Sequence, residues 1–383
     1  MDDIIIVTVV ITCCNKYSQE EKYIVKMNKC SIVMAMCIML AITSTACKNM
    51  NSDVKVDVKT NVKVDVNENA NVKADVDVKV DENADVKVDT DVKTDTNVKV
   101  DKSMNALAEL GMNAERVTID IDEVTEEYTF LFFSDLHVVN QSEEVVEKET
   151  VDGRISMYTG WNGLTSTENW KLITEALGEC DADGVLLGGD MVDFASAKNL
   201  TQLNEGLQKL KTPFMYVRAD HDTEAFYCDE KTKWQTEELH SDIDGNEEIF
   251  LWEYDEFCVV GVNFSTSQLS ESAVDSFEQI YELGKPIILM IHVPVNSLVD
   301  DSLAMESKKV WTDRNLTWGV DCHYYPDNNT SRFLELIYEE DSLVKEILGG
   351  HLHFEWDGKV TDTVYQHVFK PACEGYYGIV TVK

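Results

Sequence analysis

The sequence predicts an α/β fold for the C-terminal part of this 383-residue chain. From about Met104 onward, short apolar runs alternate with segments of helical periodicity, the pattern of sheets covered by helices. Five of the apolar runs end in histidine or aspartate. Hydrophobic residues make up 44% of the chain, which is enough for a substantial core.

Each expected element rests on its own pattern of residues. The strands are short apolar runs bounded by polar residues, Gly or Pro, such as YTFLFF at 128–133. The helices carry apolar residues three or four apart, as the leucines of 199–211 do. In chain order, the expected elements are strand 128–133, helix 169–180, strand 184–188, helix 199–211, strand 213–217, helix 272–283, strand 286–291 and strand 344–348.

The polar residues after these strands are candidates for one functional site. Side chains at the carboxyl ends of strands gather at the same edge of an α/β sheet. Five of the eight histidines of the chain lie at such ends. A single Asp is more often a turn or cap residue, so the indication comes from the whole set. The set is Asp135, His137, Asp190, Asp220, His221, Asp222, His292, His351 and His353.

Imidazole nitrogens and carboxylate oxygens in this number suit a pair of divalent metal ions. Two ions about 3.5–4 Å apart can hold a hydroxide between them and clamp phosphoryl oxygens. Mn, Fe and Zn all accept such ligands, so the sequence leaves the metal open.

Five short blocks in order carry a resemblance to a known family. They read DLH at 135–137, GDMVD at 189–193, ADHD at 219–222, His292 alone and GHLH at 350–353. This succession resembles the calcineurin-like metallophosphoesterases. The resemblance implies a four-layer α/β/β/α sandwich with two mixed sheets, and metal-dependent hydrolysis of a phosphoester.

The resemblance also implies roles for the residues of the blocks. Asp135, His137 and His353 would hold the first metal, and Asp190 would bridge the two. His292, His351 and Asp220 would hold the second. His221 would assist the leaving group, and Asp222 would orient that imidazole.

The third block departs from the family pattern at two positions. Ala219 stands where the family has Gly, so the local backbone is expected to differ. Asp220 stands where it has Asn, which brings the charge of a two-metal site nearer to neutrality. We therefore expect either a slight preference for phosphodiesters over dianionic monoesters or a trivalent iron in the site. The alternative from another class is a catalytically weak or inactive metal-binding surface lipoprotein that acts as a binding module.

Two further sets of residues stay open at this stage. Arg154 and Arg218 are expected either to meet phosphate oxygens or to form surface ion pairs. Aromatic residues between His292 and Gly350, Trp311 among them, form either a substrate wall or a satellite core.

The first hundred residues predict export and anchoring. The uncharged run 31–46 follows Lys29 and ends at Cys47, which suggests a secretory signal peptide. Small residues before Cys47 resemble the lipobox of bacterial lipoproteins, which implies lipidation at Cys47; the alternative is an uncleaved membrane anchor. The expected organisation is a non-native extension over 1–26, a signal peptide and lipobox over 27–47, a spacer over 48–103 and the metallophosphoesterase domain over 104–383.

The spacer alternates Val with Lys and Asp, without Gly, Pro or aromatic residues. Alternation alone predicts strand. Because the segment has little apolar surface to bury, we expect a solvated chain, with a β-rich stalk as the alternative. Either would hold a domain away from a bacterial membrane, outside the cytoplasm.

The formal charge of −38 limits the partners of the protein, and residues 103–383 carry −35 of it. Such acidity repels nucleic-acid backbones, so non-specific nucleic-acid binding is not expected. The expected partners are a small phosphorylated substrate and, through the lipid anchor, a membrane.

Overall fold

The computed structural model divides the chain into two units, Met1–Val98 and Lys99–Lys383, which are described separately. In the first unit it describes residues 4–13, 19–28, 57–66 and 72–81. In the second it describes residues 102–122, 124–142, 147–178, 180–224, 233–244, 248–263, 268–313 and 326–383. The run 31–46 and Cys47 lie outside these ranges, so the expected signal peptide and lipidation site stay predictions.

The first unit contains two antiparallel hairpins. β1 (Ile4–Cys13) pairs with β2 (Gln19–Asn28), and β3 (Asp57–Val66) pairs with β4 (Val72–Asp81). The second hairpin lies inside the segment for which a solvated chain was expected, so over these twenty residues the structure has the β-rich alternative. The alternation of Val with Lys and Asp is the sequence pattern that favours strand over this segment. Among the described residues, no helix is both long and apolar enough to cross a membrane.

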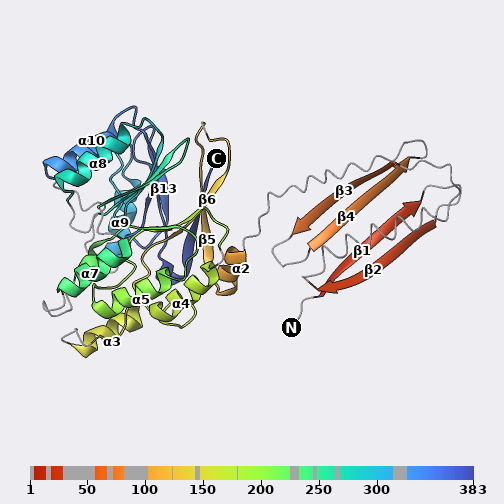
Figure 1. Ribbon diagram of the computed structural model, residues 1–383, viewed down its shortest axis with the longest axis horizontal. Helices are drawn as coiled ribbons and strands as arrows, with labels where there is room; N and C mark the ends of the chain where they lie inside the picture. Colours follow the sequence, from red (N-terminus) through yellow and green to blue (C-terminus); the bar gives the residue numbers. More distant parts are fainter. Residues whose placement is uncertain are drawn as a thin grey trace. The chain divides into compact units, whose positions relative to one another are not determined.

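Two β-sheets form the centre of the second unit (Figure 1). The five-stranded sheet has the order β5-β15-β6-β7-β8, and the six-stranded sheet has the order β13-β14-β12-β11-β10-β9. Both are mixed: β6, β7 and β8 run parallel, as do β10, β11, β12 and β14, with antiparallel neighbours at β15, β9 and β13. The strands are β5 (Asn113–Ile119), β6 (Tyr128–Phe133), β7 (Gly184–Leu187), β8 (Phe214–Tyr216), β9 (Ile249–Glu253), β10 (Cys258–Val262), β11 (Ile287–Met290), β12 (Val344–Gly349), β13 (Trp356–Lys359), β14 (Tyr365–Val368) and β15 (Tyr376–Val382).

The sheets pack face to face because the residues of each strand alternate between two apolar layers. Phe130 and Phe132 of β6 point into a core shared with Ile288 and Met290 of β11. Leu131 and Phe133 point to the opposite face, where they join a separate core. β6 is therefore buried on both sides, which explains why its sequence is a continuous apolar run.

Helices cover both outer faces. Leucines of α5 and Trp170 of α4 pack on the five-stranded sheet. Phe277 of α8 and Phe333 of α10 pack on the six-stranded sheet, with their rings 4.7 Å apart. In Figure 1, α8 and α10 lie together on one side of the unit, and α4 and α5 lie on the other. The helices are α2 (Lys102–Glu109), α3 (Lys148–Met157), α4 (Ser166–Leu177), α5 (Ala197–Leu207), α6 (Asp220–Thr223), α7 (Lys233–Asp244), α8 (Glu271–Tyr281), α9 (Ser302–Asp313) and α10 (Asn328–Tyr338).

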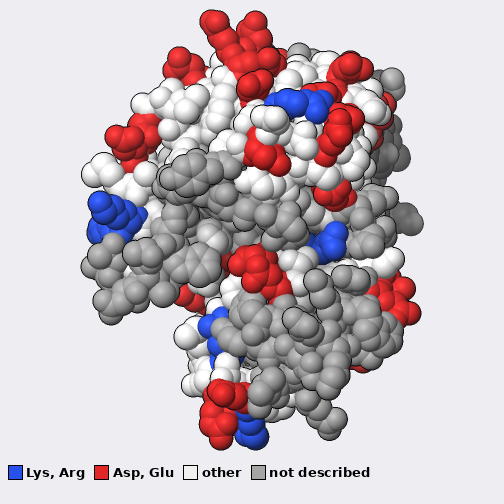
Figure 2. Space-filling model, turned by 90° about the vertical axis from the view of Figure 1, so that its left-hand side faces the viewer, with Lys and Arg blue, Asp and Glu red and all other residues white. Residues whose placement is uncertain are grey.

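This arrangement confirms the expected α/β/β/α sandwich with two mixed sheets. Its surface carries the acidity of the sequence. Figure 2 shows a face on which Asp and Glu side chains cover more area than Lys and Arg. An anionic substrate therefore needs a local source of positive charge to bind here.

Candidate metal centre

The candidate ligands come from loops at the carboxyl ends of five strands. Asp135 and His137 follow β6, Asp190 follows β7, and the third block follows β8 as α6. His292 follows β11, and the pair His351 and His353 follows β12. Since three of these strands belong to one sheet and two to the other, the loops meet across the same edge of the sandwich.

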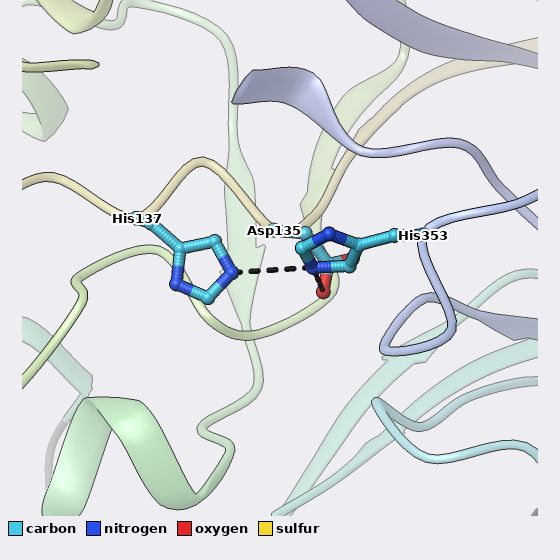
Figure 3. A group of neighbouring side chains, drawn as sticks. All are labelled: Asp135, His137 and His353. Carbon is cyan, nitrogen blue, oxygen red and sulfur yellow. Dashed lines mark hydrogen bonds and ion pairs between the residues drawn. The ribbon is translucent and has the colours of Figure 1, made fainter. Parts of the chain in front are cut away.

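One group consists of Asp135, His137 and His353, whose ligand atoms lie within 4.8 Å of one another. Nε2 of His353 is 3.2 Å from Oδ1 of Asp135 and 3.3 Å from Nε2 of His137. Figure 3 shows the two imidazoles facing each other from separate loops, with the carboxylate of Asp135 beside them. These are the three residues expected at the first metal.

A second group consists of Asp190, His292 and His351, all of them buried. Nε2 of His292 lies 3.2 Å from Oδ2 of Asp190 and 3.8 Å from Oδ1 of Asp135. Nδ1 of His292 contacts the main-chain oxygen of Gly188 at 2.8 Å, which directs Nε2 toward the carboxylates. Oδ2 of Asp190 also lies 3.9 Å from Nε2 of His137, so Asp190 stands between the two groups.

The backbone of the ligand loops adopts an unusual conformation. In the described part of the chain, every residue other than glycine with a positive φ is a candidate ligand: Asp135, His137, Asp190, His351 and His353, at φ between 51° and 68°. This left-handed conformation is uncommon for residues with a Cβ, and it clusters at functional sites. With this backbone, His353 takes part in the first group and His351, two positions earlier, in the second.

Two glycines make room for the ligands. A Cβ at Gly350 would lie 2.4 Å from Oδ2 of Asp135, and one at Gly189 would lie 2.7 Å from Nδ1 of His292. Gly189 also has a φ of +93°. The glycines of the second and fifth blocks are thus required by close packing against ligand side chains.

The electrostatics of the site show a need for positive charge. Asp135 and Asp190 are fully buried, which opposes ionisation, yet His292 lowers the pKa of both carboxyls. Burial opposes protonation of His292, but Asp190 and Asp135 raise its pKa to about 10. Burial, together with His292, lowers the pKa of His351 to about 3. The positive charge of protonated His292 thus offsets part of the negative charge of the two buried carboxylates. A bound metal cation can take over that role.

The donor set fits divalent metal ions. Oδ1 of Asp190 is buried without a hydrogen bond, a costly state unless an ion binds there. In the first group, the nitrogens of His137 and His353 face each other beside a carboxylate oxygen. Nitrogen and oxygen donors of this kind are typical ligands of Mn, Fe and Zn.

The structure places His221 beside Asp193. Nδ1 of His221 contacts the main-chain oxygen of Asp193 at 2.5 Å, and the ring centroid lies 5.0 Å from that of His137. Burial opposes protonation of His221, but Asp190 raises its pKa. His221 is thus a nearly buried imidazole next to the first group, and its role in assisting the leaving group stays a prediction.

Asp222 was expected to orient the imidazole of His221, but its hydrogen bonds in the structure go chiefly to the main chain. Its carboxylate accepts hydrogen bonds from three main-chain N–H groups, those of Asp190 (2.7 Å), Val192 (3.0 Å) and Ala219 (2.9 Å). Burial and the charge of Asp190 raise its pKa to about 6. Asp222 therefore ties the second block to the third through the backbone, and Asp193 contacts the His221 ring.

Neither departure of the third block is settled by the structure. Ala219 has an extended backbone (φ −111°), which accepts its methyl group without strain, and the expected difference from the family's backbone stays a prediction. Asp220 begins α6 but belongs to neither group of ligand atoms. Its role as a ligand of the second metal stays a prediction.

Around the site the structure adds two residues that the sequence did not single out, His240 and Tyr158, and it gives contacts to Asp193 and Trp311. Asp193 binds Arg154, His240 contacts the main-chain oxygen of Asp222 at 2.5 Å, and Tyr158 stacks on His137. The ring centroid of Trp311 in α9 lies 5.9 Å from that of His353. One aromatic residue of the segment between His292 and Gly350 therefore reaches the metal-ligand groups. The second block contains Asp193, and Trp311 lies in the aromatic segment between His292 and Gly350, but no sequence pattern indicated His240 or Tyr158.

These observations define the class of site, a cluster of histidine and carboxylate ligands for divalent metals at the edge of a sandwich. The family model for calcineurin-like phosphoesterases matches residues 128–355, more than half of the chain. The chain therefore belongs to the calcineurin-like phosphoesterase family, and its activity is metal-dependent phosphoester hydrolysis.

Among solved structures, a dimetal phosphatase from Danio rerio is similar, with 13% identity and a TM-score of 0.40 over 64% of this chain and 88% of that chain. A comparison with curated proteins found no match.

Proposed function

We propose that the protein binds two divalent ions of Mn, Fe or Zn and hydrolyses phosphodiesters slightly better than phosphomonoesters. The observation that carries the proposal is the pair of adjacent ligand groups, with Asp190 between them. When bound, two divalent ions would supply the charge that holds phosphoryl oxygens and activates water.

The residues of the chain would then divide the remaining tasks. Asp135, His137 and His353 would hold one ion, His292 and His351 the other, and Asp190 both. His221 is directed by its Nδ1 contact to Asp193, so Nε2 is the atom that would give a proton to the leaving oxygen. The buried setting excludes water from the ligands and strengthens their interaction with the phosphoryl group.

The preference for diesters is supported by charge. The domain is strongly acidic, and five aspartates lie in the three aspartate-bearing blocks that meet at the site. A dianionic monoester meets more repulsion there than a monoanionic diester.

An Asp220→Asn variant tests this preference. We expect its ratio of monoester to diester hydrolysis to rise several-fold, because one negative charge near the site is removed. Glu224→Gln, four residues further along and past the end of α6, is the matched control and should leave the ratio unchanged. An unchanged ratio in Asp220→Asn would show that charge at this position does not set the preference.

We also propose that the protein works outside the cytoplasm as a lipoprotein anchored at Cys47. The apolar run after Lys29 and the small residues before Cys47 support this location. Mass spectrometry of the mature N-terminus should find a lipidated Cys47. A peptide beginning at Met1 or Met27 in the membrane fraction would contradict the proposal.

A further inference from the structure

We propose that Arg154 is a positioning residue of the metal centre: it fixes the carboxylate of Asp193, and Asp193 orients the imidazoles of His137 and His221. The inference rests on the proposed function for its catalytic meaning. Its structural content concerns the affinity of the centre for metal, which can be measured independently.

Arg154 holds Asp193 in a two-point contact. Nε of Arg154 donates to Oδ2 of Asp193 at 2.8 Å, and Nη2 donates to Oδ1 at 2.5 Å. The side chain of Asp193 is completely buried and that of Arg154 is 18% exposed. A planar guanidinium on both oxygens of a carboxylate sets the rotation as well as the position of that carboxylate.

Asp193 in turn faces two histidines of the site. Its Oδ1 lies 3.5 Å from Nδ1 of His137 and 3.7 Å from Nδ1 of His221, and its main-chain oxygen contacts the same nitrogen of His221. The two carboxylate contacts are longer than ordinary hydrogen bonds, so they act chiefly through charge. A negative charge beside Nδ1 favours the tautomer with its proton there, which leaves the lone pair on Nε2. Nε2 of His137 is the atom that faces His353 in the first group.

Tyr158 connects Arg154 to one face of the His137 ring. Its ring stacks on the His137 ring with centroids 4.1 Å apart and an interplanar angle of 11°. Nη2 of Arg154 donates to the Tyr158 hydroxyl at 3.1 Å, and the guanidinium carbon lies 5.0 Å from the Tyr158 centroid. One arginine thus supports His137 both through a carboxylate at its edge and through an aromatic ring on its face.

A third cluster of ligand-type residues could be either another metal site or a support for the first group, and the contacts of Arg154 decide between them. His137, Asp193 and His221 also bring three ligand atoms within 4.8 Å of one another, as a metal site would. Here, however, the charge of the carboxylate is already balanced by Arg154, with which Asp193 shares two hydrogen bonds. The cluster is therefore a support for the first group, and Arg154 is its cation.

The test is a titration of the purified metal-free protein with Mn²⁺, in which calorimetry measures the affinity of each binding event. In Arg154→Ala, we expect one of two binding events to weaken about 10–100-fold, the range found when residues that orient metal ligands are removed. The other event should change less than threefold. Arg154→Lys keeps the charge but loses the two-point geometry, so its affinity should fall between those of Arg154→Ala and the unaltered protein.

Arg332→Ala is the matched control. Arg332 also makes a two-point contact with a carboxylate, that of Glu278, but between α8 and α10 on the outer layer. It should leave both binding events unchanged. If Arg154→Ala does not fold, as judged by circular dichroism, Arg154→Lys carries the test alone. A folded Arg154 variant with both binding events as in the unaltered protein would overturn the proposal.

Kinetics separate a failure of this inference from a failure of the proposed function. At saturating metal, Arg154→Ala should lower kcat for a chromogenic diester about 10–100-fold and change KM less than threefold, because the residue does not contact substrate. If metal affinity falls in the Arg154 variants as expected but the protein hydrolyses no phosphoester, the proposed function is contradicted and the inference is not. A protein that hydrolyses diesters equally well with and without Arg154 would contradict the inference alone.

Discussion

Gly350 packs against the candidate ligand Asp135, so Gly350→Ala tests the geometry of the first group. The added Cβ would lie 2.4 Å from Oδ2 of Asp135, 2.5 Å from Oγ of Ser134 and 2.8 Å from Cβ of Ser134. Carbon–oxygen contacts in proteins are about 1 Å longer than the first of these distances, so Asp135 must move by roughly that amount. Its oxygens also accept the N–H of His351 at 3.1 Å, which ties any shift to a second ligand.

The consequences are large for binding and moderate for folding. Metal–ligand distances tolerate only about 0.2 Å, and a 1 Å displacement at a reacting centre costs about 100-fold in rate. Overpacking of this kind costs about 1–3 kcal/mol of folding free energy. We therefore expect a folded variant with metal affinity reduced at least tenfold and kcat reduced about 100-fold.

The assay combines Mn²⁺ titration, thermal melting and hydrolysis of a chromogenic diester. Gly153→Ala is the matched control, because a Cβ at Gly153 meets no atom within 4 Å and the position lies inside α3. It should raise stability by about 0.5–1 kcal/mol and leave activity unchanged. If Gly350→Ala binds metal and turns over within twofold of the unaltered protein, the geometry deduced for Asp135 is wrong.

Three other changes give distinct outcomes. His221→Ala should bind metal normally and lower kcat about 10²–10⁴-fold, with a greater loss for diesters with poor leaving groups; an equal loss for all leaving groups would argue against proton donation. Burial and Asp357 raise the pKa of Glu346 from 4.5 to about 8, so the folded state binds its proton more tightly than the unfolded state. The free energy of unfolding should therefore fall by about 1 kcal/mol per pH unit between pH 4.5 and 8, and urea titrations of Glu346→Gln should show a flatter slope; an equal slope would contradict this assignment. Cys47→Ser should abolish partition of the expressed protein into a detergent phase, and retention there would favour an uncleaved anchor.

The sequence predicted the part of the fold that depends on local pattern. Runs such as YTFLFF are largely apolar because β6 is buried by the second sheet on one side and by α4 and α5 on the other. The histidines and aspartates that follow such runs were expected at one edge, and the structure brings six of them into two groups. That expectation needs only the alternation of strands and helices and the direction of parallel strands.

Contacts between distant side chains could not be predicted in the same way. Arg154 and Asp193 are 39 residues apart and nothing in their spacing pairs them. Asp222 follows His221 directly, which suggested an imidazole partner, but the start of α6 turns its carboxylate toward the main chain of Asp190. Such outcomes depend on rotamers and loop geometry, which carry no periodic signal.

The central claim is that this chain hydrolyses phosphoesters with metal ions held by residues from both sheets. The most direct measurement is hydrolysis of a chromogenic diester by the purified protein before chelation, after chelation and after Mn²⁺ is restored. We expect activity to disappear with chelation and to return with the metal, and a double variant Asp190→Asn/His292→Ala to stay inactive throughout. Activity that survives chelation, or a metal-loaded protein without activity toward any diester or monoester, would contradict the account.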